Sequence, residues 1–211
     1  MLEKLPSVIG QALQDRRAGL DSIAFNLIDL RNGTAAISVS SLAFGDHEAI
    51  PEQYTADGVG TSPPLEWTGV PDGTGSLLLM VEDADAPTPH PLVHAIVASL
   101  PPKDGNIGEG ALGDDGLDGD IGRNSYLRTG WLPPDPPPGH GVHRYAFQVF
   151  ALDSEAVLPG TPGREAALRA IEEHAIASGC LIGTYERPDG SIKIPASTAV
   201  GVVGPTQTPG T

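Results

Sequence analysis

Residues 77–87 read Leu-Leu-Leu-Met-Val-Glu-Asp-Ala-Asp-Ala-Pro, an apolar run that ends in acidic residues and a proline. Side chains alternate along a β-strand, so Leu79, Val81 and Asp83 should share one face. The proline forces the chain to turn soon afterwards. The stretch therefore predicts a strand whose apolar face ends in the carboxylate of Asp83. That carboxylate either caps loop amides or lines a cavity. From this stretch alone, the structural role of capping loop amides is favoured.

Similar short apolar runs lie on both sides of this stretch, separated by Gly, Pro, Asp and Asn. The predicted strands are Ala36–Phe44, Ser76–Glu82, Leu92–Ser99 and Arg144–Leu152. They follow one another too closely for repeated βαβ units, so the pattern favours a largely antiparallel sheet or sandwich.

Helical spacing is confined to two other parts of the chain. Residues 1–31 predict a helical N-terminal extension, with Gly19 as a stop. Thr161 and Pro162 resemble a helix start, and the apolar stripe that follows predicts a helix ending at Gly179. The prediction is one β-rich domain over residues 36–190 with peripheral helices, followed by a flexible tail at 191–211 that is rich in Ser, Thr, Gly and Pro.

Composition narrows the possible functions. The formal net charge is -15, which disfavours binding to nucleic acids or acidic membrane surfaces. No apolar run approaches the ~20 residues of a spanning helix, and the first twenty residues do not resemble a signal peptide. Cys180 is the single cysteine, which excludes an internal disulfide and multi-cysteine metal sites. We expect a cytoplasmic protein without membrane anchoring.

Histidines accompany two of the predicted strands. His94 should share a face with Leu92 and Ile96, where a lone histidine is more often a hydrogen-bonded core residue than a catalyst. The run at 133–139, Pro-Pro-Asp-Pro-Pro-Pro-Gly, could be a polyproline ligand for a partner. Because it leads directly into a strand, a rigid loop is favoured. His143 and Tyr145 should share one face of that strand.

These segments, in this order, resemble the phosphatidylethanolamine-binding protein family. The resemblance rests on Asp83-Ala84-Asp85-Ala86-Pro87, on His94, and on the proline-rich loop that ends in His143-Arg144-Tyr145. Three further segments resemble the bacterial branch of the family: Ser62-Pro63-Pro64-Leu65-Glu66-Trp67, Gly122-Arg123-Asn124-Ser125 and Gly183-Thr184-Tyr185-Glu186-Arg187. The resemblance spans about residues 36 to 187.

The resemblance implies a central antiparallel sheet, a smaller second sheet and a helix near the C-terminus. It also implies a small pocket for phosphate, acetate or a phosphorylated headgroup, and a homodimer. Carried over position by position, the ligand-binding residues would be Asp83, His94, Pro136, Pro137, His143 and Tyr145. Histidines and a tyrosine hydroxyl can donate hydrogen bonds to anion oxygens. Neither lipid binding nor kinase inhibition follows from the family's name.

Two function classes stay open. The favoured hypothesis is a module that binds a small anion or phosphorylated small molecule and acts on a protein partner. The alternative is a hydrolase or lyase in which His94 or His143, oriented by Asp83, serves as general base. No activated nucleophile accompanies these residues, so we assign no catalytic residue.

Cofactor and metal motifs do not support a further class. The chain has no P-loop, Rossmann glycine pattern or nucleophile elbow. The pairs His90/His94 and His140/His143 have zinc-like spacing without suitable companion ligands. The acidic run at 114–120 resembles a calcium loop only in composition. We therefore predict neither a cofactor nor a metal.

Overall fold

The computed structural model describes residues 6–28, 35–113 and 117–188. The tail predicted for residues 191–211 lies outside these ranges. The same holds for both ends of the predicted N-terminal extension and for the first three residues of the acidic run at 114–120.

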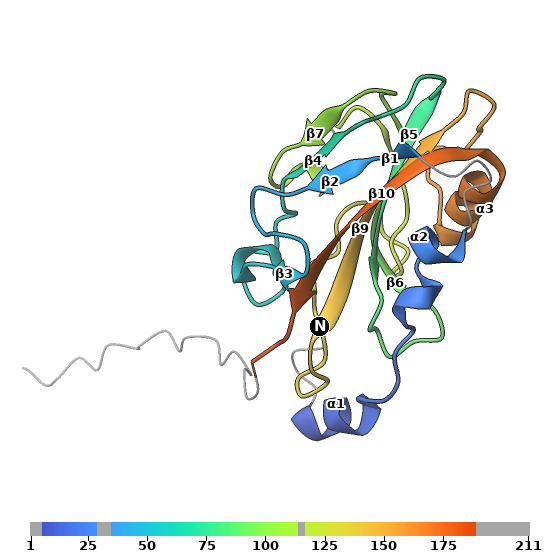
Figure 1. Ribbon diagram of the computed structural model, residues 1–211. Coiled ribbons are helices and arrows are strands. Elements are labelled where there is room, and N and C mark those ends of the chain that lie inside the picture. The colour runs from blue at the N-terminus through green and yellow to red at the C-terminus, as the bar shows by residue number, and fades with distance from the viewer. Residues whose placement is uncertain (1–5, 29–34, 114–116, 189–211) are drawn as a thin grey trace, which may run out of the picture.

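A seven-stranded sheet forms the centre of the molecule (Figure 1). Its main path, in spatial order, is β1 (Ala35–Ala36), β10 (Ala175–Tyr185), β9 (His143–Leu152), β5 (Ser76–Asp83), β6 (Leu92–Leu100) and β8 (Asp120–Ile121). The short β3 (Glu48–Ala49) also pairs with β10. The long central strands are antiparallel, whereas β1 and β3 run parallel to β10. The predicted central antiparallel sheet is confirmed.

A smaller sheet covers one face of this sheet. It consists of β2 (Ser38–Ser40), β4 (Leu65–Thr68) and β7 (Gly105–Ile107). Alternate residues of the central strands, such as Leu79 and Phe147, pack with Trp67 of the smaller sheet in the larger core. Strand alternation thus directs one half of each central strand into this core.

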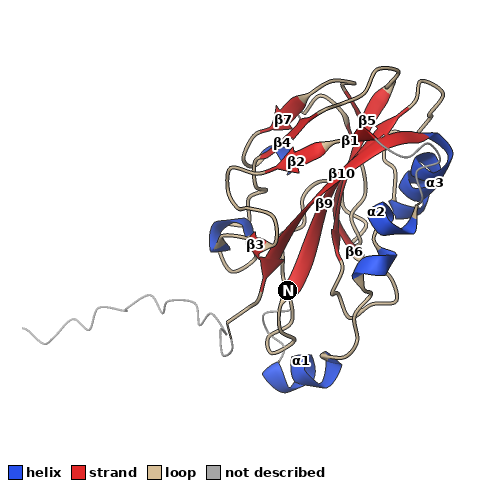
Figure 2. Cartoon of the chain, viewed as in Figure 1, coloured by secondary structure: helices blue, strands red, loops and turns tan. Residues whose placement is uncertain are grey.

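Helices cover the opposite face of the central sheet. Met80 and Ile96 pack there against Ala167 and Ile171 of α3 (Arg164–His174), next to α2 (Ala24–Leu27). The remaining helices are α1 (Ser7–Leu13) and the single-turn 3-10 helices η2 (Leu20–Ser22), η3 (Glu52–Tyr54) and η4 (Ala111–Gly113). Figure 2 shows the helices at the periphery of the strands. The predicted fold class, mainly β with peripheral helices and one C-terminal helix, is confirmed.

The C-terminal helix is shorter than the sequence predicted. It begins at Arg164, without a side-chain cap, and ends at His174. The predicted helix residues from Ala175 to Gly179 belong instead to β10, which pairs with β9 along its whole length. Apolar and small residues suit either element, and pairing with a central strand decided the outcome. The predicted strand at 36–44 likewise divides between β1 and β2, which lie in different sheets.

The N-terminal region packs on the domain, a point that the sequence left open. It is not continuous helix, because α1, η2 and α2 are separated by turns and extended residues. Glu82 of β5 accepts a hydrogen bond from the backbone amide of Ala24, 2.8 Å away, and Gln148 of β9 accepts one from Phe25 at 2.7 Å. These buried side chains satisfy the free amides at the start of α2 and fix it on the sheet.

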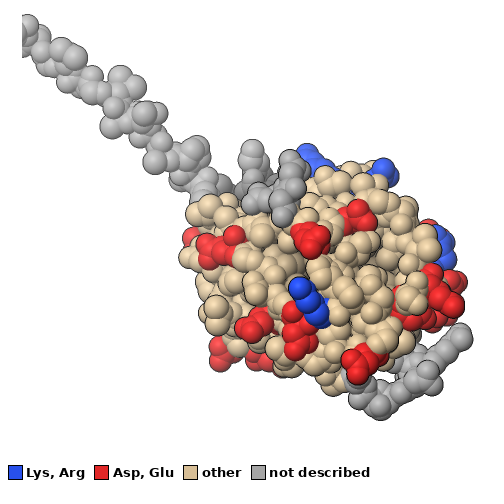
Figure 3. All heavy atoms as spheres, turned by 90° about the horizontal axis from the view of Figure 1, so that it is seen from above, with Lys and Arg blue, Asp and Glu red and all other residues tan. Residues whose placement is uncertain are grey.

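Acidic side chains are spread over the face shown in Figure 3, and basic ones are sparse there. This distribution agrees with the strongly negative net charge. Among the helices described, none combines the length and the apolar character that a bilayer crossing requires.

Candidate ligand-binding pocket

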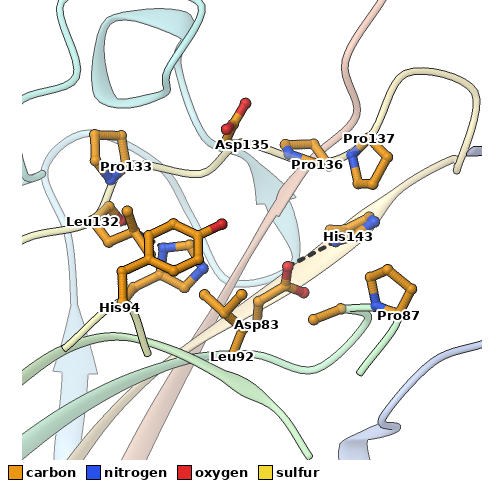
Figure 4. A pocket seen from close by; sticks show the side chains of 12 residues that line it. Asp83, Pro87, Leu92, His94, Leu132, Pro133, Asp135, Pro136, Pro137 and His143 are labelled. Atoms are coloured by element: carbon orange, nitrogen blue, oxygen red, sulfur yellow. Dashed lines mark hydrogen bonds and ion pairs between the residues drawn. The ribbon is translucent and has the colours of Figure 1, made fainter. Parts of the chain in front are cut away.

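A small cavity lies at one end of the central sheet, where β5 finishes and β6 and β9 begin. Because β5 runs antiparallel to both β6 and β9, its last residue lies beside the first residues of those strands. The proline-rich loop closes the other side (Figure 4). The volume of the cavity is about 30 Å³, which is more than one water molecule requires. The lining residues are Asp83, Ala86, Pro87, Leu92, His94, Tyr126, Leu132, Pro133, Asp135, Pro136, Pro137 and His143.

Five of the six residues predicted for the site lie in this lining, and Tyr145 does not. The Tyr145 ring is fully buried behind the wall and meets the His94 ring edge-on, with 5.2 Å between centroids. Its hydroxyl has no hydrogen-bond partner among the described residues. Burial, followed by the charge of Asp83, raises the pKa of Tyr145 well above its usual value. The phenol therefore supports the histidine instead of facing the cavity.

His94 reaches the cavity because β6 contains a β-bulge. Val81 pairs with Ala95 and Glu82 pairs with Val93, so His94 is the extra residue between them. The predicted strand face of Leu92, His94 and Ile96 is therefore wrong at its last member. A bulge reverses the alternation, and Ile96 packs in the helix-side core while His94 turns toward Asp83.

The ring of His94 has one engaged and one unengaged nitrogen. Nδ1 lies 2.5 Å from the backbone oxygen of Leu132, which can only accept, so Nδ1 carries a proton. Nε2 is buried and has no partner among the described residues. Burial lowers the pKa of His94, against the opposing charge of Asp83. The imidazole is thus neutral near pH 7, and its free Nε2 presents a lone pair.

Asp83 and His143 form a buried pair across the floor of the pocket. His143 Nδ1 lies 2.7 Å from Asp83 Oδ2, and Figure 4 shows the two side chains pointing toward each other. His143 Nε2 in turn lies 2.6 Å from Nδ1 of His140. Both nitrogens of His143 are therefore engaged within the protein, and the polar side chains left to contact a ligand are the carboxylates, His94 and Tyr126.

The turn after β5 is fixed by Asp85. Its carboxylate accepts three hydrogen bonds from Arg144, two from the guanidinium and one from the backbone amide, at 2.7–2.9 Å. Arg17 of the N-terminal region lies 3.1 Å from the same carboxylate. Burial alone would raise the pKa of Asp85, but the bonds from Arg144 and Arg17 lower it overall. The second aspartate of the Asp-Ala-Asp-Ala-Pro segment is therefore structural, whereas the first faces the pocket.

The outer wall of the pocket is held by Arg187, two residues after the end of β10. Arg187 is buried and pairs through Nε with Asp57 at 2.8 Å and through Nη2 with Asp135 at 2.7 Å. Its Nη1 donates to the backbone oxygen of Pro136. Tyr185 donates to Asp57 as well. The Gly-Thr-Tyr-Glu-Arg segment thus positions the proline loop.

Sequence reasoning missed several pocket residues. Asp135 lies inside the proline run, which received no role for its carboxylate, and Tyr126 comes directly after the Gly122–Ser125 segment and was not considered. His140 was considered only for zinc spacing. Its contact with His143 depends on the turn at Gly141, with φ of +88°, which no local pattern predicts.

Comparisons with known proteins agree with the fold and the motifs. The family model for phosphatidylethanolamine-binding proteins matches residues 40–186. A UPF0098 protein of Pyrococcus horikoshii is 41% identical over 156 residues, covering 72% of this chain and 77% of that protein. One from Aquifex aeolicus is 35% identical over 170 residues, covering 80% and 99%.

Two solved structures are also similar. One, from Chlamydia trachomatis, is titled a putative phosphatidylethanolamine-binding protein homologue; it is 37% identical, with a TM-score of 0.65, covering 74% of this chain and all of that one. The other, E. coli YbcL, is titled a new member of the mammalian family; it is 28% identical, with a TM-score of 0.68, covering 73% and 100%. The chain belongs to the phosphatidylethanolamine-binding protein family.

Proposed function

We propose that this protein binds one small anionic group, the phosphate of a phosphorylated small molecule, in the pocket between Asp83, His94 and the proline loop. The observation that carries the proposal is the buried Nε2 of His94, which lines the cavity without a hydrogen-bond partner among the described residues. A buried polar atom left without a partner destabilises the protein by about 1–3 kcal/mol. An oxygen of the ligand would supply the missing partner.

The charges in the wall determine the form in which phosphate binds. The ligand-free pocket presents three acceptors, the lone pair on His94 and the carboxylates of Asp83 and Asp135, and one phenol that can donate, that of Tyr126. The acceptors outnumber the donor, so an unprotonated oxyanion would lack partners for most of its oxygens. An added proton, either on His94 Nε2 or on a phosphate oxygen, therefore strengthens binding. Affinity should consequently increase as the pH falls.

The size of the cavity limits the ligand. At about 30 Å³, its inner part accepts only a compact group. Leu92, Ala86 and the prolines give apolar walls that cannot hydrogen-bond to a ligand. A ligand would therefore place one polar group inside and the rest of the molecule at the pocket mouth.

Calorimetric titration tests this proposal. Inorganic phosphate and phosphoethanolamine are titrated separately into the protein at pH 6 and pH 8, in two buffers of different ionisation enthalpy. We expect tighter binding at pH 6 and a heat that depends on the buffer, which reports proton uptake. The two ligands separate recognition of phosphate alone from recognition of the attached ammonium group.

Two variants complete the titration. His94→Asn keeps a donor for the Leu132 oxygen and removes Nε2, so it should lose binding, whereas His90→Asn changes an exposed histidine and should bind normally. Absence of heat and of histidine NMR shifts at millimolar phosphate would refute the proposal.

One observation favours a second function, that of an acid–base enzyme: the lone pair on His94 Nε2 has no partner among the described residues and suits a general base. His143 is a poorer candidate, since both of its nitrogens are engaged. A panel of esters and phosphoesters tests this alternative. Turnover that His94→Asn abolishes would support an enzyme, and turnover that the variant retains would exclude His94 as the base. Action on a protein partner, the homodimer and the cytoplasmic location stay predictions.

A further inference from the structure

The N-terminal region is docked beside the pocket. A Cβ at Gly10 of α1 would lie only 2.0 Å from the backbone oxygen of Pro138, so the helix touches the proline loop directly. Arg17 donates hydrogen bonds to the backbone oxygens of His140 and Val142, at 2.8 and 2.7 Å. The segment thus covers the loop that carries His140.

His140 connects this segment to the floor of the pocket through three successive hydrogen bonds. His140 Nε2 lies 2.8 Å from the backbone oxygen of Leu13, His140 Nδ1 lies 2.6 Å from His143 Nε2, and His143 Nδ1 lies 2.7 Å from Asp83 Oδ2. The carbonyl can only accept, as can an ionised carboxylate. Three bonds need three protons, whereas two neutral imidazoles supply two. The network therefore holds one extra proton.

The position of the extra proton follows from the surroundings. Burial, followed by the charge of His143, lowers the pKa of His140. The extra proton therefore belongs to Asp83 and His143, which are in direct contact. With the proton drawn on His143, that ring donates from both nitrogens, and neutral His140 accepts at Nδ1 and donates from Nε2 to Leu13. If the proton is drawn on Asp83 instead, the count is still three and the His140 tautomer is the same.

We infer that His140 is a positioning residue that couples the N-terminal segment to the protonation state of the pocket. Its Nε2 proton can hold α1 only while the Asp83–His143–His140 network keeps its third proton. The coupling extends the proposed function, because a ligand that adds a proton beside Asp83 would also favour the docked segment. The network itself does not depend on any ligand.

Loss of the third proton forces a rearrangement. The proton next to Asp83 stays on His143 Nδ1, because the buried carboxylate needs a donor. His143 Nε2 then carries a lone pair, and the short contact to His140 Nδ1 survives only if the His140 proton moves to Nδ1. Nε2 is left as a lone pair facing the oxygen of Leu13, 2.8 Å away. That contact becomes repulsive, and α1 loses its buried donor.

Three neighbours of the network, Asp85, His94 and Tyr145, do not titrate in the same range. Asp85 is held ionised by Arg17 and Arg144, and burial keeps His94 neutral and Tyr145 protonated near pH 7. Several charged or titratable groups surround His140 and His143. They are Asp83 at the end of β5, Asp85 in the turn after it, His94 on β6, Arg144 and Tyr145 on β9, Asp135 on the proline loop and Arg17 on the N-terminal segment.

Nitrogen NMR of the imidazoles tests the inference on the ligand-free protein in phosphate-free buffer. Two-bond ¹H–¹⁵N spectra of histidine-labelled protein report the tautomer of His140 between pH 5 and pH 9. We expect Nε2–H at low pH and a change to Nδ1–H in the same step in which the network loses its third proton. A His140 tautomer that is unchanged through that step would overturn the inference.

Hydrogen exchange measures the effect on the segment. After correction for intrinsic rates, amides of residues 7–17 should exchange about fivefold faster once the proton is lost, the equivalent of one ordinary hydrogen bond. His140→Gln offers the Leu13 oxygen a donor that does not titrate, so this variant should exchange independently of pH. The matched control, His90→Gln, alters an exposed histidine and should keep the wild-type pH dependence.

Adding phosphate to the same experiments separates the proposed binding function from the proposed coupling through His140. Phosphate should shift the tautomer change to higher pH if it binds as proposed. If the tautomer change occurs without ligand but phosphate has no effect, the proposed function fails while the coupling stands. If phosphate binds and the tautomer or the exchange rates do not respond to pH, the coupling fails alone.

Discussion

Arg187 donates a hydrogen bond from Nη1 to the backbone oxygen of Pro136, 2.8 Å away, and thereby ties the end of the described chain to the pocket wall. The same guanidinium contacts Asp57 and Asp135, and the side chain is completely buried. One cation thus contacts two carboxylates from different parts of the chain. The pocket is therefore formed by residues that are remote in sequence.

Replacing Arg187 with Met should destabilise the protein by about 3–5 kcal/mol, because it leaves buried carboxylates without their cation. Urea unfolding at pH 7 measures this change in the free energy of unfolding. Arg169→Met is the matched control, since Arg169 forms an exposed pair with Glu165 on α3 and should cost at most about 0.5 kcal/mol. Equal losses in the two variants would contradict the role assigned to Arg187.

The strands around the pocket could be predicted because their signal is local. Asp83 ends an apolar face, and His143 and Tyr145 begin another, so alternation alone placed them correctly on their strands. His94 required more, since its bulge depends on pairing with β5 and leaves no mark in the sequence. The strand itself was therefore predicted, but the bulge made the predicted face of Ile96 wrong.

The error in the C-terminal helix has a similar cause. Gly179 looked like a helix stop, but it lies within β10, where a Cβ would come 2.0 Å from the backbone oxygen of Ile37. A close approach by a segment 142 positions earlier cannot be read from local periodicity. The need for glycine at position 179 becomes clear only when the backbone at Ile37 is seen against β10.

Gly179→Ala should therefore destabilise the fold by about 1–3 kcal/mol, as overpacking does in other cores. The added methyl group must displace the chain at Ile37 from β10. Gly160→Ala is the control, because apart from its chain neighbours no atom of the described residues lies within 4 Å of its Cβ position, and its φ is not in the left-handed region. Thermal unfolding of both variants tests the prediction, and an unchanged melting temperature for Gly179→Ala would be inconsistent with the observed approach.

His94 should make the ligand-free protein sensitive to acid. Its pKa is lowered in the folded state by burial, so the unfolded chain takes up the proton first. The contribution of neutral His94 is fully present above the unfolded pKa of about 6.5 and is lost as the pH falls below it. His94→Asn removes this titration, so the variant should lose less stability than the wild type between pH 7 and pH 5.

Urea titrations in phosphate-free buffer at pH 7, 6 and 5 provide the measurement. His90→Asn, at an exposed position, should follow the wild type throughout. If the stability difference between His94→Asn and the wild type is the same at all three pH values, His94 does not titrate as described.

Cys180 should be unreactive while the protein is folded. Its thiol lies on β10, and burial, followed by the charges of Asp46 and Glu82, raises its pKa to about 12. Only the thiolate reacts with alkylating reagents, so alkylation at pH 8 should be on the order of 100-fold slower than for free cysteine. Iodoacetamide labelling followed by mass spectrometry measures the rate, with urea-unfolded protein as the control. Rapid labelling of the folded protein would mean that β10 opens at this position, because the half-buried thiol beside Asp46 and Glu82 should otherwise stay protonated.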